Sequence, residues 1–155
     1  MAEMKRSAGR ERQTRRQPSQ VTAGREMESS TRQPVQAYVT CGGSKPDQPY
    51  VVPSNKRLVI EYVSGSVGCR NGQLWGIRLD TTVADVLVTH RLLWGPRQEG
   101  GETDSYLFAQ LVHLYADPAT KVRLDLNGSG TLVGKAAISG YLVEARPLVA
   151  VRRST

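Results

Sequence analysis

The sequence predicts an all-β fold, an antiparallel β-sandwich or jelly roll of about seven or eight strands. Apolar side chains recur at every second position along most of residues 35–146, turn residues separate these segments at short intervals, and no convincing helical stripe interrupts them. The chain of 155 residues is long enough for one ordinary domain. We therefore expect a single β-sandwich at residues 35–146, which leaves no room for a two-domain enzyme.

The charge of the chain is concentrated at its two ends. The formal net charge is +7, of which residues 1–36 contribute +4 and residues 146–155 contribute +3, so that residues 37–145 are neutral. All nine aromatic residues lie between Tyr38 and Tyr141. A segment without large apolar side chains cannot offset its loss of chain entropy on folding. We predict a disordered basic arm at residues 1–34 and a basic C-terminal tail at residues 147–155.

Alternating patterns place the first strands. Val35–Cys41 has apolar residues at every odd position, and Lys121–Asn127 has them at every even position, which is typical of strands with one buried face. Arg57–Ser64 is apolar on both faces, so we expect a central strand there. Another strand is expected at Leu74–Leu79, with Trp75, Ile77 and Leu79 on one face, after a type I′ turn at Asn71-Gly72.

The longer segments complete the sandwich. Ala84–Trp94, Tyr106–Tyr115 and Val133–Ala145 are rich in Val, Leu and aromatic residues. In Tyr106–Tyr115 the leucine spacing also fits a helix, but its aromatic residues and Val favour a strand.

The segment Gly128–Lys135 matches a phosphate-binding loop only in part. Ser129 stands where a Walker A motif has glycine, and Ala136 stands where it has Ser or Thr. The segment also lies between two expected strands, so we predict a hairpin turn rather than a phosphate site.

Three segments of the chain form a recognisable pattern: Val52-Pro53 followed by Lys56–Gly65, then Leu114–Pro118, and then Ser139–Val143. Through these residues the chain resembles small uncharacterised bacterial β-sandwich proteins. The resemblance covers about residues 50–145 and implies a fold rather than an activity. Many such proteins are exported, whereas this chain has a polar basic arm in the place of a leader.

No catalytic, cofactor or metal site is expected from the sequence. His90 and His113 lie within strands, and neither C-x-x-C nor H-x-H, which would nucleate a zinc site, occurs. A Ser/His/Asp set remains open because its members meet only in three dimensions. Cys41 and Cys69 are the only cysteines. They form a disulfide if the compartment is oxidising and remain two buried thiols if it is not, and we favour free thiols.

Two other features suggest binding. The acidic segment Gln98–Asp104 could hold calcium, but its spacing matches no EF-hand and we favour a solvated hairpin tip. Trp75, Trp94 and several tyrosines could form an aromatic platform for a sugar or a base, although the core also requires aromatic residues.

The arm is the segment most suited to nucleic acid. Basic side chains can contact phosphates without a fixed fold, and those of the arm are Lys5, Arg6, Arg10, Arg12, Arg15 and Arg16. Interspersed glutamates and the absence of aromatic residues weaken this interpretation, and we favour a polar linker or solubilising tail.

The function expected from the sequence is that of a non-enzymatic binding or assembly module. Its unknown ligand is expected to be a protein or a carbohydrate, and the sequence is compatible with an oligomer. The alternative is a small coat-like jelly-roll subunit that binds nucleic acid through its arm, and an enzyme with a dispersed site ranks third. No apolar run approaches the roughly 18 residues that cross a bilayer, and residues 1–36 contain no apolar signal-peptide core. A cytoplasmic location is therefore favoured over membrane insertion or secretion.

Overall fold

The fold is described from a computed structural model for residues 32–145, and every regular element in this range is a β-strand. The predicted arm (residues 1–34) lies outside these residues up to residue 31, whereas Gln33 and Pro34 at its end belong to the first strand, and the predicted tail lies outside them as well. The strands are β1 (Gln33–Gly42), β2 (Tyr50–Val51), β3 (Lys56–Arg70), β4 (Leu74–Val83), β5 (Val86–Leu92), β6 (Asp104–Ala116), β7 (Lys121–Gly128) and β8 (Thr131–Glu144). The predicted all-β class is thus confirmed, and the strand choice for Tyr106–Tyr115 is confirmed with it.

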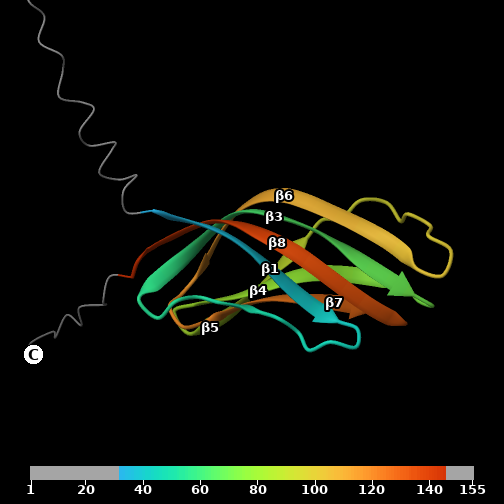
Figure 1. The fold of residues 1–155 in the computed structure, drawn as a ribbon, viewed down its shortest axis with the longest axis horizontal. Helices are drawn as coiled ribbons and strands as arrows, with labels where there is room; N and C mark the ends of the chain where they lie inside the picture. Colours follow the sequence, from blue (N-terminus) through green and yellow to red (C-terminus); the bar gives the residue numbers. More distant parts are fainter. Residues whose placement is uncertain (1–31, 146–155) are drawn as a thin grey trace, which may run out of the picture.

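The eight strands form two four-stranded antiparallel sheets. Sheet I has the order β1-β8-β3-β6 and sheet II the order β2-β7-β4-β5. In Figure 1 the labels of sheet I follow one another from the top as β6, β3, β8 and β1, with those of sheet II below them. Two interleaved four-stranded sheets with this order are the arrangement of a jelly roll.

Most connections in this fold pass from one sheet to the other. Within residues 32–145, only β4 and β5 are consecutive strands of the same sheet, joined by a hairpin. The expected hairpins at Gln98–Asp104 and Gly128–Lys135 are therefore wrong, because β5 and β6, and likewise β7 and β8, belong to different sheets. Local turn chemistry marks a change of direction but does not determine which sheet the next strand joins.

The type I′ turn lies in a different place from the one predicted. Ala84 and Asp85 have φ values of 50° and 62°, and they join β4 to β5 as a two-residue turn with both φ angles positive. Asn71 has a φ of 54°, but Gly72 does not share the positive φ that a type I′ turn needs. Glycine is required at position 72 for another reason, since a Cβ there would lie 2.0 Å from the carbonyl oxygen of Ser129.

Alternation along the strands builds the core between the sheets. Val39, Ile60, Ile77, Leu79 and Ile138 are almost completely buried and represent both sheets. Each such side chain contributes about 1.5–3 kcal/mol relative to an exposed one. β3 lies between β8 and β6, which confirms the prediction of a central strand there.

One prediction about which side chains face the core was wrong. Trp75 is 59% exposed, whereas Ile77 and Leu79 are buried. The pairing of β4 with β7 shifts register between Leu74 and Gly76, so this bulge turns the indole away from the core.

Candidate ligand-binding site

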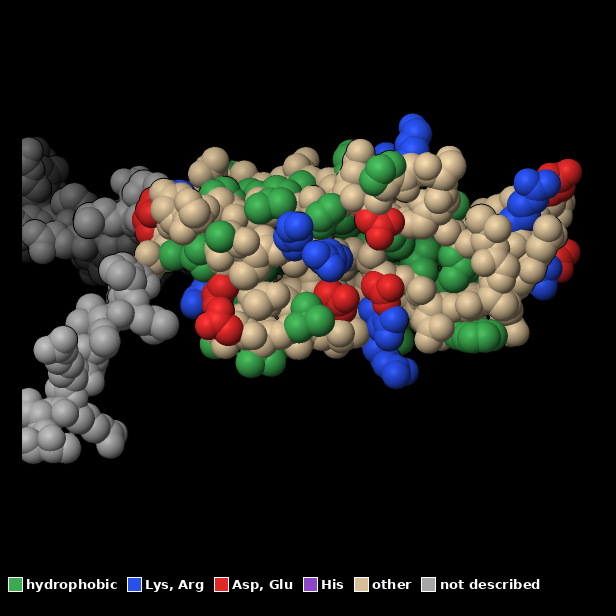
Figure 2. Space-filling model, turned by 90° about the horizontal axis from the view of Figure 1, so that it is seen from below, with side chains coloured by type: hydrophobic (Ala, Val, Ile, Leu, Met, Phe, Trp, Pro, Cys, Tyr) green, Lys and Arg blue, Asp and Glu red, His purple; other side chains and the backbone are tan. Residues whose placement is uncertain are grey.

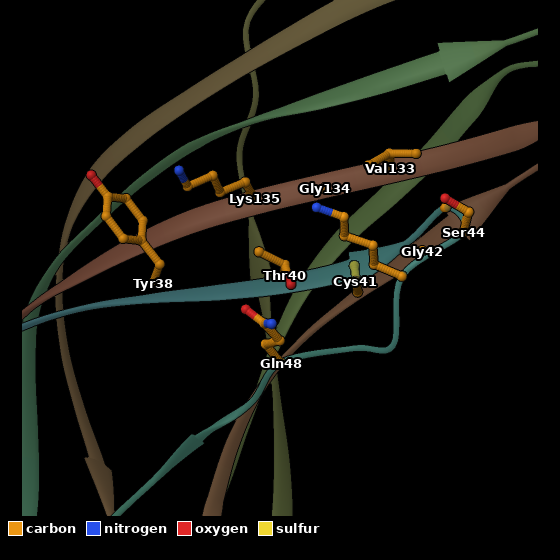
Figure 3. Close-up of a pocket in the computed structure, with 11 residues that line it drawn as sticks. Tyr38, Thr40, Cys41, Gly42, Ser44, Gln48, Val133, Gly134 and Lys135 are labelled. Carbon is orange, nitrogen blue, oxygen red and sulfur yellow. The ribbon is translucent and has the colours of Figure 1, made fainter.

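An open hollow of mainly apolar lining lies on the outer side of sheet I, where the β1–β2 loop folds back along β1. Gln48 of this loop pairs with Thr40 of β1 through two backbone hydrogen bonds of 3.1 and 3.0 Å. The loop and the neighbouring ends of β1 and β8 enclose a volume of about 550 Å³ (Figure 3). We name this space the Tyr38–Lys135 hollow; its lining residues are Tyr38, Thr40, Cys41, Gly42, Gly43, Ser44, Lys45, Gln48, Val133, Gly134 and Lys135.

Two glycines let the chain turn at the edge of this hollow. Gly42 and Gly43 have φ values of 75° and 77°, in the left-handed region that side chains disfavour. A Cβ on Gly42 would also lie 2.1 Å from the carbonyl oxygen of Leu132. The backbone N–H of Gly42 donates to Oδ1 of Asp47 at 2.9 Å, which closes the loop on itself.

The hollow has an aromatic ring and an ammonium group at one end. The amine of Lys135 lies 4.0 Å from the centre of the Tyr38 ring, a cation–π contact, and both side chains are on the same side of the sheet (Figure 3). The register pairs Tyr38 with Ala137 and Thr40 with Lys135, so β1 and β8 hold these groups in fixed positions. Tyr38 is nevertheless 65% exposed and accessible to a ligand.

Positive charge and hydrogen-bonding groups line the rest of the hollow. Lys45 is the second lysine of the lining, and within residues 32–145 neither it nor Lys135 has a carboxylate oxygen within 4.0 Å. Thr40, Ser44 and Gln48 add hydroxyl and amide groups. Two lysines without carboxylate partners beside neutral donors can bind the oxygens of an anion.

The thiol of Cys41 is not a nucleophile in this setting. Cys41 is buried and free, and burial, with smaller effects from the charges of Asp47 and Asp125, raises its pKa to about 12. The thiolate form, which carries the reactivity of cysteine, is therefore scarce near neutral pH. Cys69 is also buried and free, in agreement with the preference for free thiols.

A second pocket, of about 410 Å³, lies on the other side of the β1–β2 loop and is more polar. Asp47, Asp80, Arg123 and Asp125 contribute charged groups of both signs to its lining, and Asp125 also forms an ion pair with Arg78. Figure 2 likewise shows acidic and basic side chains close together near the middle of the face seen from below. Because its charges offset one another, this pocket is less suited to an anion than the hollow.

The histidines are held by neighbours in their own sheets. Nε2 of His90 lies 3.1 Å from the hydroxyl of the buried Thr81, and burial lowers the pKa of His90 despite the opposing charge of Asp80. Nε2 of His113 lies 2.7 Å from the Tyr115 hydroxyl on the outer side of sheet I. In the part of the chain that the structure describes, no group of three or more His, Cys, Asp or Glu residues could hold a metal ion.

The remaining candidates from the sequence do not converge on one site. In the acidic segment, Glu102 pairs with Arg70 at 2.6 Å, and Asp104 pairs with Arg97 at 2.9 Å and raises the pKa of that arginine. Trp75 on β4 and Trp94, which follows β5, are both exposed, and neither lines the hollow or the polar pocket. The basic residues of the arm lie outside the described range: Lys5, Arg6, Arg10, Arg12, Arg15 and Arg16.

Sequence reasoning missed Tyr38, Lys45 and Lys135. The alternating pattern marks Tyr38 only as an outward position of a strand, and Lys135 belongs only to a rejected phosphate motif. The signal that could have found them is an exposed aromatic residue on an edge strand that is followed by a glycine-rich loop with a lysine.

Comparisons with known proteins found no family model, curated protein or solved structure that matches the chain. Residues 32–145 contain no helix with the length and apolar character needed to span a membrane.

Proposed function

We propose that the chain is a non-enzymatic binding module and that its ligand is an acidic carbohydrate held in the Tyr38–Lys135 hollow. The observation that carries this proposal is the pair of lysines, Lys45 and Lys135, without carboxylate partners among the described residues, in an open hollow that also holds an exposed tyrosine ring. A uronic acid carries a carboxylate for the lysines and hydroxyl groups for Thr40, Ser44 and Gln48. Its C–H face can pack against the apolar parts of the lining.

The chemistry of the lining supports binding rather than catalysis. Its thiol has a raised pKa, and neither His90 nor His113 is among the residues that line it. Turnover of hydrolase substrates that is abolished by His90→Ala or His113→Ala would overturn the non-enzymatic part of the proposal.

The binding experiment is calorimetric titration of the full chain with trigalacturonate, with the fully methyl-esterified trisaccharide as the neutral control. We expect the acid to bind and the ester to bind at least tenfold more weakly, because a hydrogen bond to a charged group contributes about 1.5–3 kcal/mol. Lys135→Met and Lys45→Met should each weaken binding of the acid about tenfold. Lys121→Met, on β7 and outside the hollow, is the matched control and should have little effect.

A second candidate function, a coat-like subunit that binds nucleic acid, is favoured by the strand order of the two sheets, which is that of a jelly roll. Its nucleic-acid contacts would come from Lys5, Arg6, Arg10, Arg12, Arg15 and Arg16. Size-exclusion chromatography with light scattering separates the two candidates. A particle of many chains that forms with an added oligonucleotide supports the coat-like function, and a monomer indifferent to the oligonucleotide contradicts it.

A further inference from the structure

The edges of the two sheets differ in how far they are covered. The free edge of β1 is covered by Gln48 only at Thr40, and β2, at one edge of sheet II, is only two residues long and so offers little to pair with. The first half of β6 is covered too, because Gln98 exchanges two hydrogen bonds of 2.8 Å with Ser105, and Gly95 donates to the carbonyl of Leu107. Within the described residues, β5 pairs with β4 alone and leaves its other edge open.

The open edge of β5 runs beside the second half of β6. Ala84, just before β5, donates its N–H to Asp117, just after β6. Leu93, just after β5, donates its N–H to Gln110 in the middle of β6. These two contacts place β5 along one side of the sandwich together with the end of β6, and we name this the β5–β6 side.

Exposed apolar side chains are concentrated on this side. Leu93 and Leu111 are 80% and 85% exposed. Of the thirteen exposed large apolar residues in the described range, eight lie on β5, on β6 or directly after β5: Val86, Leu87, Val88, Leu93, Trp94, Leu107, Leu111 and Tyr115. A concentration of this kind on one side marks an interaction surface rather than scattered surface residues.

Charge, which usually protects an edge strand from pairing, is nearly absent here. Ser105–Ala116 contains no Asp, Glu, Lys or Arg, and Val86–Leu92 contains only Arg91. Natural edge strands avoid pairing with other chains through charged side chains, proline or bulges. β5 uses only the single arginine.

We propose that β5 pairs antiparallel with β5 of a second copy of this chain, about a twofold axis that passes between the Thr89 residues of the two copies. In this register Val86 lies opposite Leu92 of the second copy, Val88 opposite His90 and Leu87 opposite Arg91. The strand is therefore self-complementary, since no two like charges face each other directly, as an interface with twofold symmetry requires. The pairing joins the two copies of sheet II into one continuous sheet and shields Val86, Leu87 and Val88.

The mass of the full chain in solution, measured by size-exclusion chromatography with light scattering over a range of concentrations, tests the pairing. We expect a dimer that dissociates on dilution. Leu87→Lys should weaken the dimer at least tenfold, because two new ammonium groups would face Arg91 across the axis. Leu87→Glu should preserve or tighten it, because the new carboxylates would face Arg91 instead.

Two controls distinguish pairing in this register from a general effect of added charge or of unfolding. Val51→Lys adds the same charge at an exposed position of β2, on the other edge of sheet II, and should leave the dimer unchanged. Thermal unfolding followed by circular dichroism shows whether each variant remains folded. A wild-type monomer at every concentration, equal weakening by Leu87→Lys and Leu87→Glu, or equal weakening by Val51→Lys would overturn the proposal, whatever the outcome of the carbohydrate titration.

Discussion

The carboxylate of Asp117 accepts a hydrogen bond of 2.7 Å from the backbone N–H of Ala84, which ties the β4–β5 turn of sheet II to the end of β6 in sheet I. Its other oxygen accepts a bond of 2.8 Å from Nε of Arg57, at the start of β3. The Asp117 side chain is only 18% exposed, so water replaces these bonds poorly. One carboxylate thus connects three strands at one end of the sandwich.

We expect Asp117→Ala to lower the free energy of unfolding by about 1–3 kcal/mol, since it leaves the Ala84 N–H and the Arg57 guanidinium without their acceptor. Glu99→Ala removes a carboxylate from the exposed β5–β6 connection and should change the free energy by less than about 0.5 kcal/mol. Urea denaturation of the two variants measures both values. An equal change in the free energy of unfolding for the two variants would show that the hydrogen bonds of Asp117 do not stabilise the fold.

Glycine at position 84 of the β4–β5 turn should raise the stability of the protein. Alanine at the φ of 50° found at position 84 costs about 1–2 kcal/mol, which exceeds the entropy that glycine loses on folding. Ala84→Gly should therefore stabilise the protein by about 0.5–1 kcal/mol. Ala109→Gly, in the middle of β6, should destabilise it instead. Thermal unfolding midpoints that move in the same direction for both variants would contradict this account of the turn.

The stability of the protein should fall below about pH 6.5 through His90. Burial lowers the pKa of His90 in the folded chain, so the unfolded chain takes up a proton first as the pH falls. The contribution of neutral His90 to the free energy of unfolding is complete above the pKa of the unfolded chain. It is lost progressively as the pH falls toward the lower pKa of the folded chain. Urea denaturation at pH 7.5 and 5.5 should show that the free energy of unfolding falls less between these pH values in His90→Gln than in the wild type. An identical loss in the two proteins would assign the pH dependence to other groups.

Both thiols should be unreactive in the native protein. Cys41 and Cys69 are buried, and a pKa of about 12 for Cys41 leaves little thiolate at pH 8. We expect Ellman's reagent to label neither thiol at pH 8 in the native chain and to label both in guanidinium chloride. Rapid labelling of one native thiol would show that the core opens readily.

The sequence was sufficient to predict strands but not their partners. Alternation at Lys121–Asn127 is a local consequence of one buried face, and Val122 and Leu124 are buried as expected. Whether Ser129-Gly130 leads back into the same sheet depends on packing between β8 and the distant strands β1 and β3, which local patterns do not record. The bulge that exposes Trp75 depends in the same way on its partner strand.

The candidate site could not be predicted because its parts are remote in the sequence. Tyr38 and Lys135 meet only because β1 pairs with β8, and Lys45 joins them only because Asp47 and Gln48 fold the loop back on β1. The sequence did predict the outward direction of Tyr38. Side chains alternate along β1, so Tyr38 and Thr40 face outward while Val39 and Cys41 are buried.

The most direct test of the proposed function is an amide chemical-shift titration of the ¹⁵N-labelled full chain with trigalacturonate. We predict saturable shifts confined to residues 38–48 and 133–135, lost on Lys135→Met and absent with the methyl ester. Shifts centred on the polar pocket at residues 121–125, or no saturable shifts at all, would contradict the assignment of the Tyr38–Lys135 hollow as an acidic-carbohydrate site.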